Sequence, residues 1–193
     1  MQKLGMVILM FILLFLSLYL RWNDNCFFKY YPIFQIFPDN KTEVEEMRNI
    51  VGNRDDETTK LFMEHDIHGA KHLFTVEMPE TKDIWMSQSL RNFMISFIIA
   101  LKLFFNRKRP FQTDPNMGHI DTPTSYNPSF PSGHAMEAYM ISTSIGKRRP
   151  ELKDKAMEIA DRCAQLRVEG GVHFPSDIKA AKWIVDNIFY YFI

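Results

Sequence analysis

The chain has 193 residues, which is enough for one domain with a substantial hydrophobic core. Its formal net charge is zero, so electrostatics favours no nucleic-acid partner and we expect none. The two cysteines, Cys26 and Cys163, do not form a disulfide scaffold, and we interpret both as free thiols.

An uncharged and almost wholly apolar segment runs from Leu4 to Leu20, between Lys3 and Arg21. Its length is at the short end of what spans a bilayer. No small-residue cleavage site follows, so we favour an uncleaved membrane anchor in residues 1–22, with a cleaved signal segment as the alternative. We expect residues 23–193 to form a lumenal or extracellular domain, or a secreted or periplasmic one after cleavage.

The stretch Cys26–Pro38 is rich in aromatic residues, and its prolines disfavour a long helix. We interpret it as a cover for the core, with a position at the membrane interface as the alternative. Two short polar helices are predicted next, at Lys41–Val51 and Asp56–His65.

Three histidines, His65, His68 and His72, follow at spacings of three and four. One helical face could carry all three, which is compatible with a metal site. However, Gly69 weakens the helix, and no cysteine or Glu-x-x-His pattern accompanies the histidines. We therefore predict a solvated, structural role for them and no metal.

The longest predicted helix covers Asp83–Asn106, and its second half is apolar on every side. This pattern is typical of a central core helix. The apolar run Phe93–Phe105 is too short to span a bilayer, so we do not expect several membrane spans. Pro110–Pro131 is predicted as a loop, and a loop of this length is more often functional than not.

Three further helices are predicted towards the C-terminus. The first begins at Ser132 or Gly133 and runs to about Gly146, and the last runs from near Pro175 to the C-terminus. Between them, a helix that begins at Pro150 and ends before Gly170 carries an apolar stripe, formed by Leu152, Ala156, Ile159, Cys163 and Leu166. No convincing pair of alternating strands occurs, so the predicted fold is an all-α, compact helical bundle.

Lys102 lies within the apolar second half of the Asp83–Asn106 helix. A buried lysine is unfavourable unless it meets an anion, although its stem could instead extend to the surface. Arg109 follows seven positions later, before Pro110, and would lie on the same side if the helix persisted. A second Arg-Pro pair at Arg149 lacks a lysine at the corresponding position.

The tetrapeptide Pro131-Ser132-Gly133-His134 opens a predicted helix. Its free backbone N–H groups can bind an anion, and the glycine allows that anion to approach closely. His134 would then lie beside the bound group. The simpler alternative is an N-cap serine followed by an incidental histidine.

A third segment contains Arg167, His173 and Asp177. The histidine and the aspartate are four positions apart at a helix start, so the carboxylate can reach an imidazole nitrogen and select its tautomer. Taken alone, these residues would more often form a surface network. Together, the three segments supply groups that can bind a phosphate, attack it and protonate the leaving group.

In this order, the segments resemble the signature of the type 2 phosphatidic acid phosphatase superfamily. That superfamily also includes bacterial class A non-specific acid phosphatases and vanadium-dependent haloperoxidases. Its signature reads Lys-x6-Arg-Pro, Pro-Ser-Gly-His and Ser-Arg-x5-His-x3-Asp. Residues 102–177 match all three motifs, except that Leu166 replaces the serine of the third. The resemblance implies a helical bundle of the acid phosphatase and haloperoxidase type, and is strongest to the soluble acid phosphatases.

The resemblance also implies roles for these residues. His173 would be the nucleophile that forms a phosphohistidine, oriented by Asp177, while His134 would protonate the leaving alkoxide and later activate water. The phosphoryl oxygens would be bound by Lys102, Arg109, Ser132, Gly133 and Arg167. No metal and no other cofactor is expected.

The predicted function is therefore hydrolysis of phosphomonoesters, with either a small-molecule or a lipid phosphate as substrate and the membrane as a partner. A vanadate-dependent haloperoxidase is the alternative within enzymes, because the same groups bind vanadate. The non-enzymatic alternative is a catalytically inactive, membrane-tethered binding protein.

Overall fold

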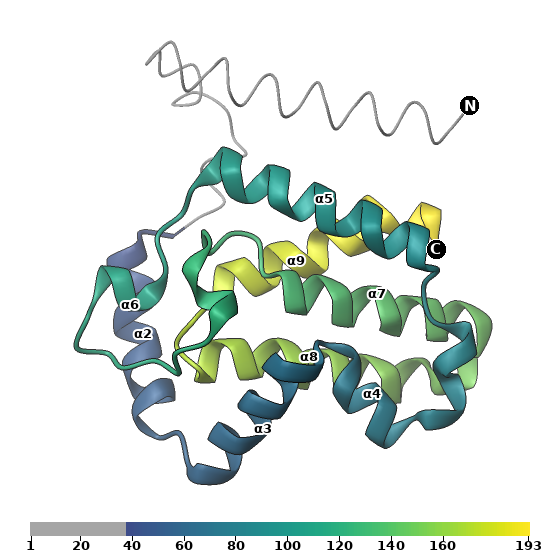
Figure 1. The fold of residues 1–193 in the computed structure, drawn as a ribbon, viewed down its shortest axis with the longest axis horizontal. Coiled ribbons are helices and arrows are strands. Elements are labelled where there is room, and N and C mark those ends of the chain that lie inside the picture. Colours follow the sequence, from purple (N-terminus) through teal and green to yellow (C-terminus); the bar gives the residue numbers. More distant parts are fainter. Residues whose placement is uncertain (1–37) are drawn as a thin grey trace.

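The computed structural model describes residues 38–193, and every regular element in that part of the chain is helical (Figure 1). The predicted all-α class is therefore confirmed. The predicted anchor in residues 1–22, Cys26 and nearly all of the aromatic stretch lie outside the described residues.

The helices follow one another with short connections, apart from the segment between α5 and α7. In chain order they are α2 (Asn40–Gly52), α3 (Asp56–His68), α4 (Lys71–Glu77), η3 (Pro79–Ile84), α5 (Gln88–Phe105), α6 (Pro110–Thr113), η4 (Pro123–Tyr126), α7 (Gly133–Arg148), η5 (Pro150–Leu152), α8 (Lys153–Glu169), α9 (Pro175–Asn187) and η6 (Phe189–Phe192). The segment predicted as one long loop thus contains two short helical turns, α6 and η4.

Local capping explains where the early helices begin and end. Asp55 accepts a hydrogen bond from the Thr58 amide at 2.7 Å and starts α3, and Gly69 ends that helix with φ of 78°. Ser87 accepts a bond from the Leu90 amide at 3.3 Å, so α5 begins later than the predicted Asp83. The residues before it form the separate 3-10 turn η3.

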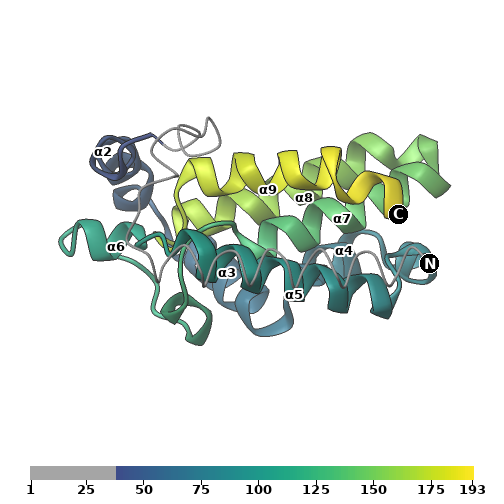
Figure 2. The same cartoon turned by 90° about the horizontal axis from the view of Figure 1, so that it is seen from above.

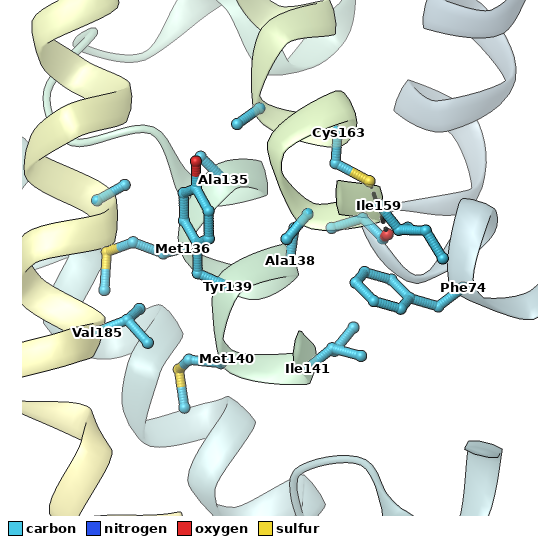
Figure 3. Packing of buried hydrophobic residues seen from close by; sticks show 14 of the residues in the cluster. Phe74, Ala135, Met136, Ala138, Tyr139, Met140, Ile141, Ile159, Cys163 and Val185 are labelled. Atoms are coloured by element: carbon cyan, nitrogen blue, oxygen red, sulfur yellow. Dashed lines mark hydrogen bonds between the residues drawn. The ribbon is translucent and has the colours of Figure 1, made fainter. Parts of the chain in front are cut away.

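The central helix of the bundle is α7. Its buried side chains occur on all sides, and it packs mainly against α8 and α9. Figure 3 shows Met136 and Met140 on the side of Val185 in α9, while Ile141 points towards Phe74 of α4. Small and apolar side chains on all sides of α7 let the neighbouring helices surround it.

Helix α5, which the sequence predicts as the central core helix, instead lies at the edge of the bundle (Figure 2). Ile99 is 52% exposed and Leu103 is 45% exposed, so part of its apolar surface faces outwards. By length and composition, Gln88–Thr113 is the one stretch within residues 38–193 that could cross a membrane. The prediction of a central α5 was wrong because an apolar pattern does not distinguish a core helix from one whose outer face is also apolar.

Four members of the predicted apolar stripe, Ala156, Ile159, Cys163 and Leu166, are buried on α8. The fifth, Leu152, lies in η5 and packs against the core while partly buried. The Cys163 thiol is free, as predicted, and contacts the Ala70 carbonyl oxygen at 3.6 Å. Burial raises the pKa of this thiol, so it remains protonated.

The turn between α8 and α9 brings His173 towards the body of the protein. Gly171 has φ of 72°, and a Cβ atom at this position would lie 2.7 Å from the Gly118 carbonyl oxygen. Glycine is therefore required on both conformational and steric grounds. The predicted break of the helix at Gly170 and Gly171 is observed.

Candidate active site

A cavity of about 350 Å³ lies between α5, the start of α7 and the segments that precede α7 and α9. Of the predicted site residues, five line it: Lys102, Arg109, Gly133, His134 and His173. The three sequence motifs therefore converge on one cavity. The rest of its lining comes mainly from α5, which contributes apolar side chains and Arg91, while Thr124, Asn127 and Glu137 add polar groups from other segments.

His173 and Asp177 form the predicted pair at the start of α9. The His173 Nδ1 atom lies 3.3 Å from the Asp177 Oδ2 atom, and both side chains are buried. Asp177 Oδ2 also accepts bonds from the Phe174 amide at 2.9 Å and from the Ser129 hydroxyl. Arg107 Nη1 donates to the other carboxylate oxygen at 2.8 Å. The carboxylate is therefore held in one orientation by donors on every side.

Arg109 occupies the opposite side of the His173 ring. Its Nη1 atom lies 2.9 Å from His173 Nε2. Because Nδ1 faces a carboxylate and Nε2 faces a guanidinium donor, these partners select the tautomer with hydrogen on Nδ1 and a lone pair on Nε2. Burial first, and Arg109 second, lower the pKa of His173 well below 6.5, so the ring is neutral.

The orientation of Arg109 comes from the loop rather than from helical register. Helix α5 ends at Phe105, and Asn106 has φ of 45°, so the predicted continuation to Arg109 does not occur. The guanidinium instead donates to the Val172, Thr124 and Asn127 carbonyls at 2.6, 3.0 and 2.8 Å. Burial, partly offset by Asp177, lowers the Arg109 pKa to about 10.

Lys102 is buried, so the alternative in which its stem extends to the surface is wrong. Its Nζ atom donates to the Pro128 carbonyl and to the Ser129 carbonyl, the latter at 3.3 Å. Burial, followed by the nearby Arg109, lowers its pKa to about 7. Two carbonyl oxygens thus stabilise the Lys102 ammonium group. From the sequence alone, only a bound anion was expected to do so.

The start of α7 lies against the cavity. Ser132 is the N-cap, accepting a long bond of 3.4 Å from the Ala135 amide, and it is fully buried behind Gly133. His134 stands in the first turn of this helix. Burial and then Arg167 lower its pKa well below 6.5.

Arg167 lies behind the cavity and is almost completely buried. Its Nη2 atom donates to Asp66 Oδ1 at 2.8 Å, and its guanidinium carbon lies 4.2 Å from the centre of the Phe62 ring. The Nε and Nη1 donors have no hydrogen-bond partner among residues 38–193. A buried guanidinium with two unused donors is suited to an anion with several oxygens.

Residues 89–185 match the family model of the PAP2 superfamily. The match covers half of the chain and includes all three motifs that converge on the cavity. The chain belongs to the PAP2 superfamily. This confirms the predicted family, and membership indicates a phosphatase-like activity. No curated protein matches the chain.

The PAP2 superfamily signature has a serine before the arginine of its third motif, where this chain has Leu166. Leu166 is fully buried in the hydrophobic core, next to the side chains that surround α8. Compared with the signature, this position loses a serine hydroxyl and gains an apolar side chain packed in the core. Arg167 retains its position through Asp66 and Phe62.

Several buried polar residues of the PAP2 site were not recognised in the sequence. Glu43 of α2 accepts a bond from Arg107 Nη2 at 2.5 Å, and Arg107 in turn binds Asp177. Glu43 has a detectable signal, because it precedes Met47 and Val51 by four and eight positions and so lies on the buried face of α2. Arg107 belongs to the basic run Arg107-Lys108-Arg109, which taken alone favours a solvated helix end. That interpretation is wrong for Arg107, because its side chain is buried.

The prediction of a solvated His65 is also wrong. His65 is fully buried, and its ring centre lies 5.3 Å from that of His134. Burial lowers its pKa to about 3. His68 and His72 stack on each other with ring centres 5.2 Å apart. Within residues 38–193, no group of three His, Cys, Asp or Glu side chains has a metal-binding arrangement.

Proposed function

We propose that this chain hydrolyses phosphomonoesters through a phosphohistidine formed on His173. The proposal depends on the arrangement of the His173 imidazole ring. Asp177 faces Nδ1, while Nε2 carries the lone pair and accepts from Arg109 at the cavity wall. A neutral, oriented imidazole beside a cation is what attack on a phosphate requires.

In the first step, the Nε2 lone pair attacks phosphorus and the bond to the leaving oxygen breaks. The protonated His134 gives its proton to that oxygen, so an alcohol departs. In the second step, His134 takes a proton from water as the water oxygen attacks the phosphohistidine. The N–P bond breaks, and inorganic phosphate is released from a regenerated His173.

The cations and backbone donors around the ring would hold the phosphoryl group during both steps. Arg109 would transfer its Nη1 donor from His173 to a phosphoryl oxygen, and Arg167 has Nε and Nη1 without partners among the described residues. Lys102 and the Gly133 amide lie on the same cavity, and Ser132 stands directly behind them. With three cations present, we expect phosphate release to persist in a metal chelator.

We also propose that the leaving group is apolar. On α5, four apolar side chains line the cavity between the charged Arg91 and Lys102: Met94, Ile95, Ile98 and Ile99. Ile99 is also half exposed, so this wall continues to the outer surface. A lipid phosphate therefore fits the cavity better than a nucleotide, and the predicted N-terminal anchor would place the domain at a membrane. Phosphate release from phosphatidic acid, a lipid pyrophosphate and a nucleotide, compared side by side, tests this preference.

Replacing the nucleophile tests the function itself. We expect His173→Ala to reduce phosphate release from phosphatidic acid and from p-nitrophenyl phosphate by roughly 10³-fold or more. His68→Ala, at an exposed histidine outside the cavity, should leave both rates unchanged. Rapid denaturation of the wild type during turnover should trap an acid-labile phosphoprotein. Equal rates for wild type and His173→Ala would refute the proposal.

A further inference from the structure

Asp66 of α3 brings a carboxylate into the site from outside the residues that match the PAP2 superfamily. Its side chain is 6% exposed. The Oδ1 atom accepts from Arg167 Nη2 at 2.8 Å and from Thr124 Oγ1 at 2.7 Å. The same oxygen lies 4.0 Å from His134 Nε2, which is ion-pair distance.

Helix α3 holds this carboxylate in a defined place. Phe62 lies one turn before Asp66 and is fully buried, with its ring against the Arg167 guanidinium. One face of α3 therefore contacts Arg167 through both a ring and a carboxylate. Because these contacts fix the helix, the position of Asp66 relative to His134 is also fixed.

His134 has an unfavourable environment for a general acid. Arg167 of α8, His65 of α3, and His173 and Arg109 of the neighbouring loops all face it and favour its neutral form. Lys102 and Arg91 of α5 line the same cavity. A histidine among so many cations needs a nearby anion if it is to deliver a proton.

The other carboxylates near the cavity are already paired with arginines. Glu137, one turn along α7 from His134, accepts from Arg91 Nε at 2.6 Å. Asp177 is bound by Arg107 and His173. Asp66 is paired as well, with Arg167, but its Oδ1 atom also lies at ion-pair distance from His134 Nε2. Asp66 is therefore the carboxylate positioned to act on His134.

We propose that Asp66 is a positioning residue that stabilises the protonated form of His134 while it holds Arg167 in place. The inference rests on the proposed phosphatase function. It gives the site two His–Asp pairs: Asp177 orients the nucleophile, and Asp66 supports the acid. A carboxylate beside the ring stabilises the imidazolium whichever ring nitrogen gives up its proton.

The dependence on the leaving group tests this role. Nitrophenolate departs without a proton, whereas an alkoxide requires one. In Asp66→Asn, we expect kcat/KM for an alkyl phosphate to fall by about 100-fold, the order of a general-acid contribution. For p-nitrophenyl phosphate, the loss should be smaller by at least roughly 10-fold. The high-pH limb of the alkyl phosphate profile should also move to lower pH, because the imidazolium is less stabilised.

The two esters are compared in one preparation, so their ratio does not depend on the folded fraction. Glu64→Gln is the matched control, because Glu64 is on the same helix and lies 3.6 Å from His72, outside the cavity. Glu64→Gln should leave kcat/KM unchanged for both esters. Equal losses for both esters would mean that Asp66 only holds Arg167, and higher activity would mean that it competes with phosphate. Either result overturns the inference. An inactive wild type would instead refute the phosphatase function, and the inference with it.

Discussion

Lys102 is an ammonium group whose charge depends on pH near neutrality. Its Nζ atom is buried between two carbonyl oxygens, and burial lowers its pKa to about 7. The three histidines around the cavity have pKa values below 6.5, and Arg109 remains protonated to about pH 10. Between pH 6 and 8, Lys102 is therefore the proposed phosphate-binding group whose charge changes.

This predicts a pH-dependent affinity for tetrahedral anions. Sulfate, whose own charge is constant in this range, should inhibit roughly 10-fold more weakly at pH 8 than at pH 6, because the free amine is neutral at the higher pH. Lys102→Gln should bind sulfate weakly at both values. Lys108→Gln, which removes an exposed charge nearby, should retain the wild-type dependence. An unchanged inhibition constant in the wild type would show that Lys102 stays charged.

At the scale of elements, α2 is connected to the site through buried charges. Glu43 binds Arg107, whose second terminal nitrogen binds Asp177. Glu43 also accepts from the Ser176 amide at 2.9 Å, at the start of α9. This arrangement joins α2, the segment after α5 and the start of α9 through buried, paired groups.

Removal of Glu43 should therefore destabilise the fold. We expect Glu43→Ala to lower the free energy of unfolding by about 3 kcal/mol, since it leaves part of a buried arginine and an amide without partners. Urea denaturation measures this free energy. The control variant is Glu45→Ala, at an exposed position on the same helix. A similar small effect for both variants would contradict a structural role for the buried pair.

At the scale of the whole molecule, three histidines whose pKa values are lowered by desolvation should make stability depend on pH. Their pKa values are lower in the folded protein than in the unfolded chain, so the unfolded chain binds protons first as the pH falls. Stability is therefore full above about pH 6.5 and decreases towards the folded values, which for His65 is about 3.

We expect the free energy of unfolding, measured by urea denaturation, to fall as the pH is lowered from about 6.5 to 4, at roughly 1.4 kcal/mol per pH unit for each such histidine. His65→Leu should weaken this dependence, because neither ring nitrogen of His65 has a hydrogen-bond partner among the described residues. His68→Leu, at an exposed position, should leave it unchanged. A pH-independent midpoint in the wild type would contradict the assignment of neutral buried rings.

The sequence by itself determined the helical class, the buried stripe of α8 and the chemistry of the three motifs. These features depend on spacing along the chain, which sets the exposed and buried faces of one helix and the reach of Asp177 to His173. The same local spacing could not show how Arg109 reaches the cavity, because α5 ends at Phe105 and the left-handed Asn106 redirects the chain.

Only the tertiary structure decided which helix is central and which residues join the motifs at the cavity. A hydrophobic pattern reports that a face is buried, but not which other element covers it. Asp66 meets Arg167 across 101 positions of sequence, and Glu43 meets Arg107 across 64. Such contacts arise from helix packing, so no local pattern in α2 or α3 could identify these carboxylates as partners of the site.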